Sequence, residues 1–229
     1  MKKVIAVLAL VSLLSLSAAA ASKSKESSRV EKAGEVMTEI MNVPDDIPQS
    51  LIDKAECVIV LPSVLKVAFG VSGNYGRGVM TCRSNSFKGP WGAPTMMALE
   101  GAGIGFQLGG QATDFVLLVM NEGGAKGILT GKVKLGADAS ASAGPVGRDA
   151  AAATDITLRA QILSYSRSRG LFAGVSLEGS TLRPDNPANK ALYGKDVDAR
   201  DIVLNKAVPP PPSAKLLLGT LDKRSPKHQ

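Results

Sequence analysis

The sequence predicts an α+β domain: a curled antiparallel β-sheet, closed into a barrel or a flattened sandwich, with helices at its N- and C-terminal ends. Apolar runs rich in β-branched residues fill the middle of the chain, helical spacing recurs at both ends, and glycines interrupt the central runs. Glycine within a strand marks a bulge, sharp coiling or the close approach of another backbone. The central glycines therefore favour a curled sheet over a flat one.

The first part of the chain after residue 21 has helical character. Ser28 and Glu31 can form a capping box. Apolar residues recur beside them at helical spacing: Val30, Ala33, Val36, Met37, Ile40 and Met41. These features predict an amphipathic helix over residues 28–41. Pro48 suits a first-turn position, so a second short helix is expected over residues 48–55.

The middle of the chain has strand character, because short apolar runs alternate with turn signals. The expected strands cover residues 57–61, 64–71, 78–82, 95–108, 115–120, 156–165 and 171–182. A turn signal at residues 72–74 separates the second from the third, and Gly101, Gly103 and Gly105 interrupt the fourth. A low-complexity stretch over residues 137–153 precedes the last strand pair.

The end of the chain returns to helical character. Helices are expected over residues 185–193 and 196–206, and a short one from Ser213. Between them, Pro209, Pro210, Pro211 and Pro212 impose an extended polyproline segment, which is either a ligand for an aromatic-lined groove of a protein partner or a stiff spacer. We therefore expect one domain over residues 22–206 and a proline-rich tail over residues 207–229.

The first 21 residues are typical of a secretory signal peptide. Lys2 and Lys3 precede an apolar segment, and small residues follow it. The apolar segment is shorter than the roughly 20 residues that a spanning helix needs, and no later run is long enough. Neither cysteine lies near the cleavage zone, so a lipoprotein anchor is not expected. The sequence predicts an exported, periplasmic protein without a transmembrane helix in the mature chain.

The charge balance favours an acidic partner. The formal charge is +7, and without Lys2 and Lys3 it falls to about +5. Nucleic acid is not expected, because the few aromatic residues form no array interleaved with arginine. Anionic lipid headgroups suit an exported chain better, since arginine, lysine and free backbone N–H groups bind phosphate.

Cys57 and Cys82 are the only cysteines. Export makes a disulfide between them plausible, provided that the strands carrying them are neighbours. The alternative is two buried free thiols that pack as small apolar residues. We favour the disulfide.

No catalytic, metal or cofactor site is predicted. His228, the only histidine, lies in a charged tail, and two cysteines alone cannot complete a zinc set. The glycines at 101–105 lack the following helix of a dinucleotide loop. Several aspartates could bind calcium or act as an acid and base, but each lies at an expected helix start, where capping is the commoner role: Asp45, Asp46, Asp185, Asp196 and Asp198. The sequence thus favours a non-enzymatic binding or structural protein.

Five ordered blocks carry a family resemblance: CVIVLPSVLKVAFGVSGNYGRGVMTCRS, GPWGAPTMMALEGAGIGFQLGGQATDFVLLVMN, KLGADASASAGPVGR, ILSYSRSRGLFAGVSLEGS and NKALYG. With them, residues from about 35 to 206 resemble a SYLF domain, the lipid-binding module also found in yeast actin-patch proteins that bind Las-seventeen. The resemblance implies binding of phosphoinositides or other anionic phospholipids, binding and bundling of actin in eukaryotic members, and no enzymatic activity.

The leading hypothesis is reversible docking on anionic membrane through basic residues: Arg167, Arg169, Lys132, Lys134 and Arg148. Arg167 and Arg169 lie in an expected hairpin loop, residues 166–170, which is either a plain corner or a scaffold for a phosphate site. The alternative is a structural or stress-related envelope protein that acts through protein contacts, by the proline segment or a sheet edge.

The resemblance gives the helix over residues 28–41 a lipid role as well, because some eukaryotic members contact lipid through an amphipathic helix at the start of the domain. Arg29 and Lys32, with Lys23 and Lys25, would then meet headgroups, and Val36, Met37 and Ile40 would reach the acyl boundary. The alternative is that the apolar face of this helix covers one end of the sheet.

Overall fold

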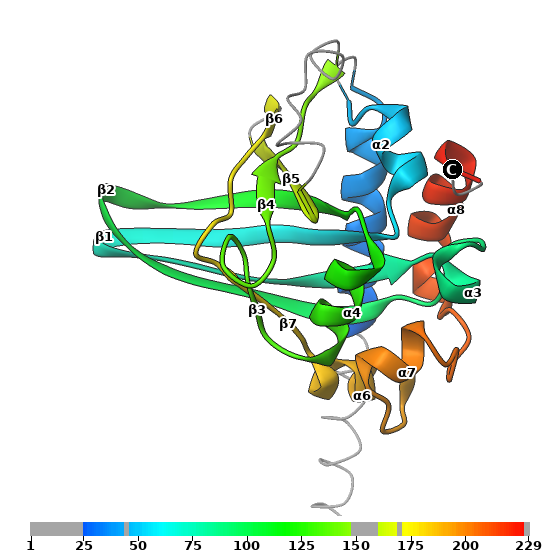
Figure 1. Ribbon diagram of the computed structural model, residues 1–229. Coiled ribbons are helices and arrows are strands. Elements are labelled where there is room, and N and C mark those ends of the chain that lie inside the picture. Colours follow the sequence, from blue (N-terminus) through cyan, green and yellow to red (C-terminus); the bar gives the residue numbers. More distant parts are fainter. Residues whose placement is uncertain (1–24, 44–45, 148–159, 169–170, 227–229) are drawn as a thin grey trace, which may run out of the picture.

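The computed structural model describes residues 25–43, 46–147, 160–168 and 171–226. In this part of the chain, helices gather at one end of a curled sheet of seven strands (Figure 1). The α+β class is therefore confirmed, with an open curled sheet and helices from both ends of the chain beside it.

Two long strands form the centre of the sheet. β1 (Cys57–Cys82) pairs antiparallel with β2 (Thr95–Val119), with Cys57 opposite Val119 at one end and Met80 opposite Thr95 at the other. A disulfide joins Cys57 to Cys82, whose Cα atoms lie 3.9 Å apart. The two ends of β1 are therefore adjacent, and the strand reverses direction along its length. The expected separate strands between residues 57 and 82 are parts of this one strand.

Two glycines leave room for neighbouring parts of the chain within the central strand pair. A Cβ atom on Gly78 would overlap the carbonyl oxygen of Val60, in the other half of β1. A Cβ atom on Gly101 in β2 would overlap the side-chain oxygen of Asn74. Gly78 thus allows the close approach of another backbone, whereas Gly101 leaves room for a side chain.

Short strands extend the central pair on both sides, in the order β3-β7-β2-β5-β4. β7 pairs with the first half of β2 and β5 with its second half, while β6 pairs only with β5. Their bounds are β3 (Val133–Lys134), β4 (Ala141–Ala143), β5 (Ile162–Ser168), β6 (Leu171–Gly174) and β7 (Thr181–Pro184).

The last strand pair differs from the prediction. The expected strand over residues 171–182 is two strands: β6 lies beside β5, whereas β7 lies between β2 and β3. β5 also continues through Ser168, so Arg167 lies in a strand opposite Phe172 and not in a loop. Hydrogen bonding to β2 and β6 overrides the local turn preference of the serines.

The helices occupy most of the places that the sequence predicts. The N-terminal helix spans residues 25–40, so Ser28 lies inside it and does not cap it. Asp185 and Asp198 cap two later helices, with their side chains accepting hydrogen bonds from Ala188 and Asp201 backbone N–H groups. The other helical elements are α2 (Gln49–Lys54), α3 (Ser84–Phe87), α4 (Glu122–Thr130), α6 (Asn186–Tyr193), α7 (Ala199–Val203), the 3₁₀ turn η2 (Pro212–Ala214) and α8 (Lys215–Arg224).

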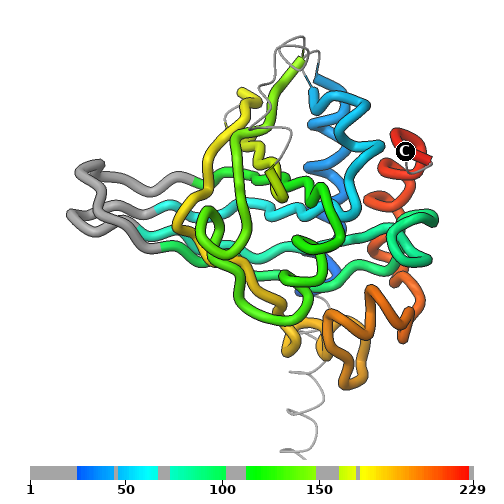
Figure 2. Tube along the Cα trace, viewed as in Figure 1, coloured from blue at the N-terminus to red at the C-terminus, as the bar shows by residue number. Residues whose placement is uncertain are grey.

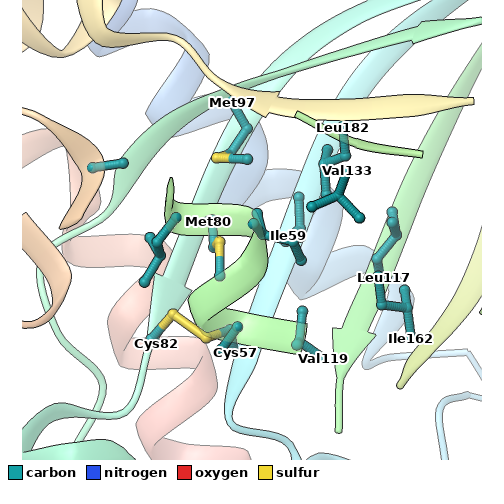
Figure 3. Packing of buried hydrophobic residues seen from close by; sticks show 14 of the residues in the cluster. Cys57, Ile59, Met80, Cys82, Met97, Leu117, Val119, Val133, Ile162 and Leu182 are labelled. Carbon is teal, nitrogen blue, oxygen red and sulfur yellow. A yellow bond between two sulfur atoms is a disulfide. The ribbon is translucent and has the colours of Figure 1, made fainter. Parts of the chain in front are cut away.

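The sheet buries apolar residues on both faces, because side chains alternate along its strands. One cluster lies inside the curl and combines Cys57, Ile59 and Leu117 with residues of α4, α7 and β7 (Figure 3). The other lies between the outer face, with Val58 and Val60, and the helices. The apolar face of the N-terminal helix belongs to this outer cluster: Val30, Ala33, Val36, Met37 and Ile40 are all buried.

Part of the C-terminal segment packs against the rest of the domain. Leu217 and Leu221 of α8 are fully buried. The hydroxyl oxygens of Thr38 and Thr220 lie 2.8 Å apart, so α8 packs beside the N-terminal helix (Figure 2). Amphipathic spacing in α8 supplies the buried stripe that holds this segment against the domain.

Candidate anion-binding site

A lysine just after α4 and a lysine in β3 lie on the same face of the sheet as an arginine of β7. Val133 pairs with Leu182 and Lys134 with Thr181. The same antiparallel register places Lys132 level with Arg183, and residues opposite each other share one face of a sheet. Two of the basic residues predicted from the sequence, Lys132 and Lys134, are therefore brought to the same face as Arg183.

Lys132 and Arg183 line a surface hollow of about 400 Å³, which we call the basic hollow. Arg200 of α7 reaches it from a third segment. The other lining residues are Leu129, Thr130, Gly131, Pro184, Asn186 and Asp198. Three cations thus face one concavity, and Asp198 is the one carboxylate among its described lining residues.

The cations of the basic hollow differ in how far they are already neutralised. Arg183 donates hydrogen bonds to Oε1 of Glu100, from Nε at 3.0 Å and Nη2 at 2.5 Å, and these bonds raise the pKa of Arg183. Lys132 and Arg200 make no ion pair with any residue that the structure describes. Their ammonium and guanidinium groups are therefore free to meet an anion.

This arrangement suits a phosphate or another multivalent anion. Arg200 can donate two parallel hydrogen bonds, while Lys132 supplies a compact charge. Arg183 and Arg200 are not among the basic residues that the sequence predicts to bind lipid. Arg183 lies in a strand and Arg200 near the start of a helix, and no feature of the neighbouring sequence indicates that either faces Lys132.

Arg167, in contrast, already has acidic partners. Its Nη2 atom lies 3.0 Å from Oδ2 of Asp114 in β2, and its Nη1 atom also pairs with Glu39 of the N-terminal helix. β2 and β7 separate β5 from β3 in the sheet, so Arg167 does not join the basic hollow. Its observed contacts hold the N-terminal helix to the sheet.

Of two basic residues of the N-terminal helix that the sequence assigns to lipid, one is ion-paired and the other is exposed. Arg29 pairs with Glu26, three residues earlier, and Lys32 is exposed. Because Val36, Met37 and Ile40 are buried in the core, they do not reach a bilayer in this structure. The helix covers the outer face of the sheet, as the alternative interpretation of its apolar stripe predicted.

Some predicted features lie outside the described residues: Arg148, Arg169, His228 and the signal peptide over residues 1–21. Within the described ranges, no helix is both long and apolar enough to span a bilayer. The same part of the chain holds no group of three or more histidine, cysteine or acidic residues that could bind a metal ion. Of the five candidate aspartates, Asp185 and Asp198 cap helices, Asp46 and Asp196 pair with Arg224 and Lys190, and Asp45 lies outside the described residues.

Residues 100–224 match the family described as "Ysc84: Las17-binding protein actin regulator". The chain is similar over 207 residues to LAS seventeen-binding protein 3 of Saccharomyces cerevisiae, at 33% identity, covering 89% of this chain and 44% of that protein. It is also similar over 213 residues to SH3 domain-containing YSC84-like protein 1 of Homo sapiens, at 33% identity, covering 90% of this chain and 61% of that protein. The chain therefore spans about half the length of the curated relatives that it matches.

Proposed function

Because the chain belongs to the Ysc84 (SYLF) domain family, we propose that it is a non-enzymatic module that binds anionic phospholipid headgroups at a membrane surface. In this proposal the basic hollow holds the phosphate, with Lys132 and Arg200 as its main contacts and Arg183 beside them. The family includes relatives named for Las17 binding and actin regulation. Those activities belong to proteins about twice as long as the matched region.

The observation that carries the proposal is the convergence of three cations on one hollow lined by a single carboxylate among the described residues. Elsewhere several arginines are neutralised by acids, as at Arg29, Arg167 and Arg224. Lys132 and Arg200 are exposed, so neither carries a large desolvation penalty before it meets a headgroup. The expected export of the chain would give it access to bacterial phospholipids.

Vesicle co-sedimentation tests the proposal. Wild-type protein is incubated with vesicles of phosphatidylcholine alone, or with added cardiolipin or phosphatidylinositol phosphate, at low and at physiological salt. We expect binding only to the anionic vesicles, and weaker binding as salt rises. Since each basic residue near such a surface contributes about 1 kcal/mol, the double variant Lys132→Gln, Arg200→Gln should partition roughly 30-fold less strongly.

The matched control is Lys54→Gln, Lys88→Gln, which removes the same net charge from exposed positions outside the hollow. It should lose several-fold less affinity than the hollow variant. Equal losses in the two variants would mean that only net charge matters, and equal binding to neutral and anionic vesicles would reject the proposal.

The second candidate function is contact with a protein through the proline segment. Pro209, Pro210 and Pro212 are exposed, and Pro211 has φ −73° and ψ 156°, the polyproline II conformation. Buried Val208 and Ala214 fix both ends of the segment. A pre-formed polyproline helix loses little entropy when it docks in an aromatic-lined groove.

Truncation at residue 206 is a poor test of that contact, because it also removes buried residues of α8. The sharper variant is Pro209→Ala, Pro210→Ala, Pro212→Ala, which changes only exposed side chains. If the segment is a ligand, pull-downs from envelope extracts should lose a specific partner with this variant. An unchanged set of partners would leave the segment as a spacer.

A further inference from the structure

The N-terminal helix and α8 lie side by side and run in the same direction (Figure 1). A Cβ atom on Gly34 would come within 2.9 Å of the backbone nitrogen of Leu217. One turn further along, Thr38 and Thr220 are in contact through their hydroxyl oxygens. Glu31 therefore lies beside the start of α8, and Met41 and Asn42 lie beside its end.

A groove of about 810 Å³ follows the outside of this helix pair; we call it the helix groove. Its apolar surface comes from Met41, Pro212, Leu216 and Gly219. Leu216 is 45% exposed, one of the few large apolar side chains in the described structure to be so open. The groove runs the length of α8, about 15 Å at 1.5 Å per residue.

The charges at the two ends of the helix groove are unequal. At the start of α8, Lys215 and Glu31 both line the groove, so one positive and one negative charge offset each other there. At its end, Lys223 and Arg224 face the groove, and only Arg224 is paired, with Asp46 at 2.5 Å. Lys223 is exposed and has no ion-pair partner among the described residues. The groove thus offers an apolar floor with a free cation at one end.

We infer that the helix groove binds a single-chain anionic amphiphile, a fatty acid carboxylate, with its head at Lys223 and its alkyl chain along Leu216. The volume lies within the range of small-molecule sites, roughly 300–1,000 Å³. A groove of this size is too small to form a stable protein interface by itself, since such interfaces bury roughly 1,200–2,000 Å². Burial of alkyl chain against the groove supplies the affinity, and Lys223 selects the negative head.

This ligand is additional to the headgroup of the proposed function, because the helix groove and the basic hollow share no lining residue. The two can be tested separately. Variants of Lys132 and Arg200 should leave fatty acid binding unchanged, whichever way the vesicle experiment ends.

Isothermal titration with dodecanoate, below its micelle concentration, tests the inference. A Cβ atom on Gly219 would meet nothing within 4 Å, so substitutions there enter the groove without disturbing the core. Gly219→Ala should bind dodecanoate like the wild type. Gly219→Phe should fill the groove and bind about tenfold less tightly or worse, with a melting temperature no lower than that of the wild type.

A second experiment tests whether the negative head of the ligand lies at Lys223. Lys223→Glu should weaken dodecanoate binding about fivefold and strengthen binding of dodecyltrimethylammonium, whereas the matched variant Lys88→Glu should change neither. Absence of saturable dodecanoate binding by the wild type would overturn the inference. Equal binding by Gly219→Ala and Gly219→Phe would overturn it as well, because the ligand would then lie elsewhere.

Discussion

Nη2 of Arg83 donates a hydrogen bond to the hydroxyl oxygen of Ser225 at 2.5 Å, across 142 positions of sequence. Arg83 is 1% exposed, stacks on the ring of Trp91 at 4.3 Å, and also donates to the carbonyl oxygen of Ala55. Trp91 donates in turn to the carbonyl oxygen of Ser225. Burial lowers the pKa of Arg83, and the charges of Asp53, Glu56 and Asp222 oppose that shift. This contact fastens the end of α8 to the sheet.

Arg83→Ala should therefore lower the free energy of unfolding by about 3 kcal/mol, because it removes the stacking and leaves buried carbonyl groups without a donor. Ser225→Ala, which removes one hydroxyl, should cost only about 1 kcal/mol. Arg83→Lys should not restore the loss, since an ammonium cannot reproduce the planar fork. Urea unfolding followed by Trp91 fluorescence measures all three. Equal stability of Arg83→Ala and the wild type would show that α8 is held without this contact.

Reduction of the Cys57–Cys82 disulfide should lower stability by about 3 kcal/mol, the entropy of closing a loop between residues 25 apart. The melting temperature with and without dithiothreitol measures the effect. The double variant Cys57→Ala, Cys82→Ala should show the lower temperature in both conditions. If the reductant destabilises this variant as much as the wild type, the disulfide is not the cause.

Gly78→Ala should cost about 3 kcal/mol, because its methyl group would meet the backbone of Val60 and neither half of β1 can move away. The control is Gly127→Ala in α4, an exposed helical glycine whose added methyl group would make only an ordinary contact with Val133. That change should stabilise the protein by about 0.5–1 kcal/mol through helix propensity. Thermal unfolding of the pair distinguishes backbone crowding from a general effect of replacing glycine.

Arg167→Ala should change anionic vesicle binding less than twofold, because the guanidinium is already paired with Asp114 and Glu39. It should instead lower the free energy of unfolding by about 1 kcal/mol, the upper end for a partly exposed pair. Co-sedimentation and urea unfolding of the same preparation measure the two effects. A large loss of vesicle affinity without a loss of stability would contradict this prediction and show that Arg167 takes part in lipid binding.

Features that depend on neighbouring residues could be predicted from the sequence. Apolar spacing indicated the N-terminal helix, Pro48 indicated α2, and Asp185 lay at the expected start of α6. The β-branched runs indicated strands, and the cysteine pair indicated the disulfide. These signals act over a few residues or, for the disulfide, follow from there being only two cysteines.

Contacts between distant segments could not be predicted in this way. The alternating pattern of residues 171–182 is compatible with one strand, and only pairing with β5 on one side and β2 on the other divides it. The sequence marked Arg167 and Lys132 alike as basic residues that could meet a lipid headgroup. The strand order then placed Arg167 against Asp114, and Lys132 level with Arg183.

The sequence by itself thus determined the α+β class, most helices and the basic character of the surface, because each follows from the spacing and chemistry of nearby residues. The tertiary structure alone decided that β1 folds back on itself, that α8 belongs to the core, and which cations remain unpaired. Those outcomes depend on register and strand order, which set the partners of each side chain across 50 to 180 residues of chain. A charge becomes available to a ligand only where that packing brings no acid to it.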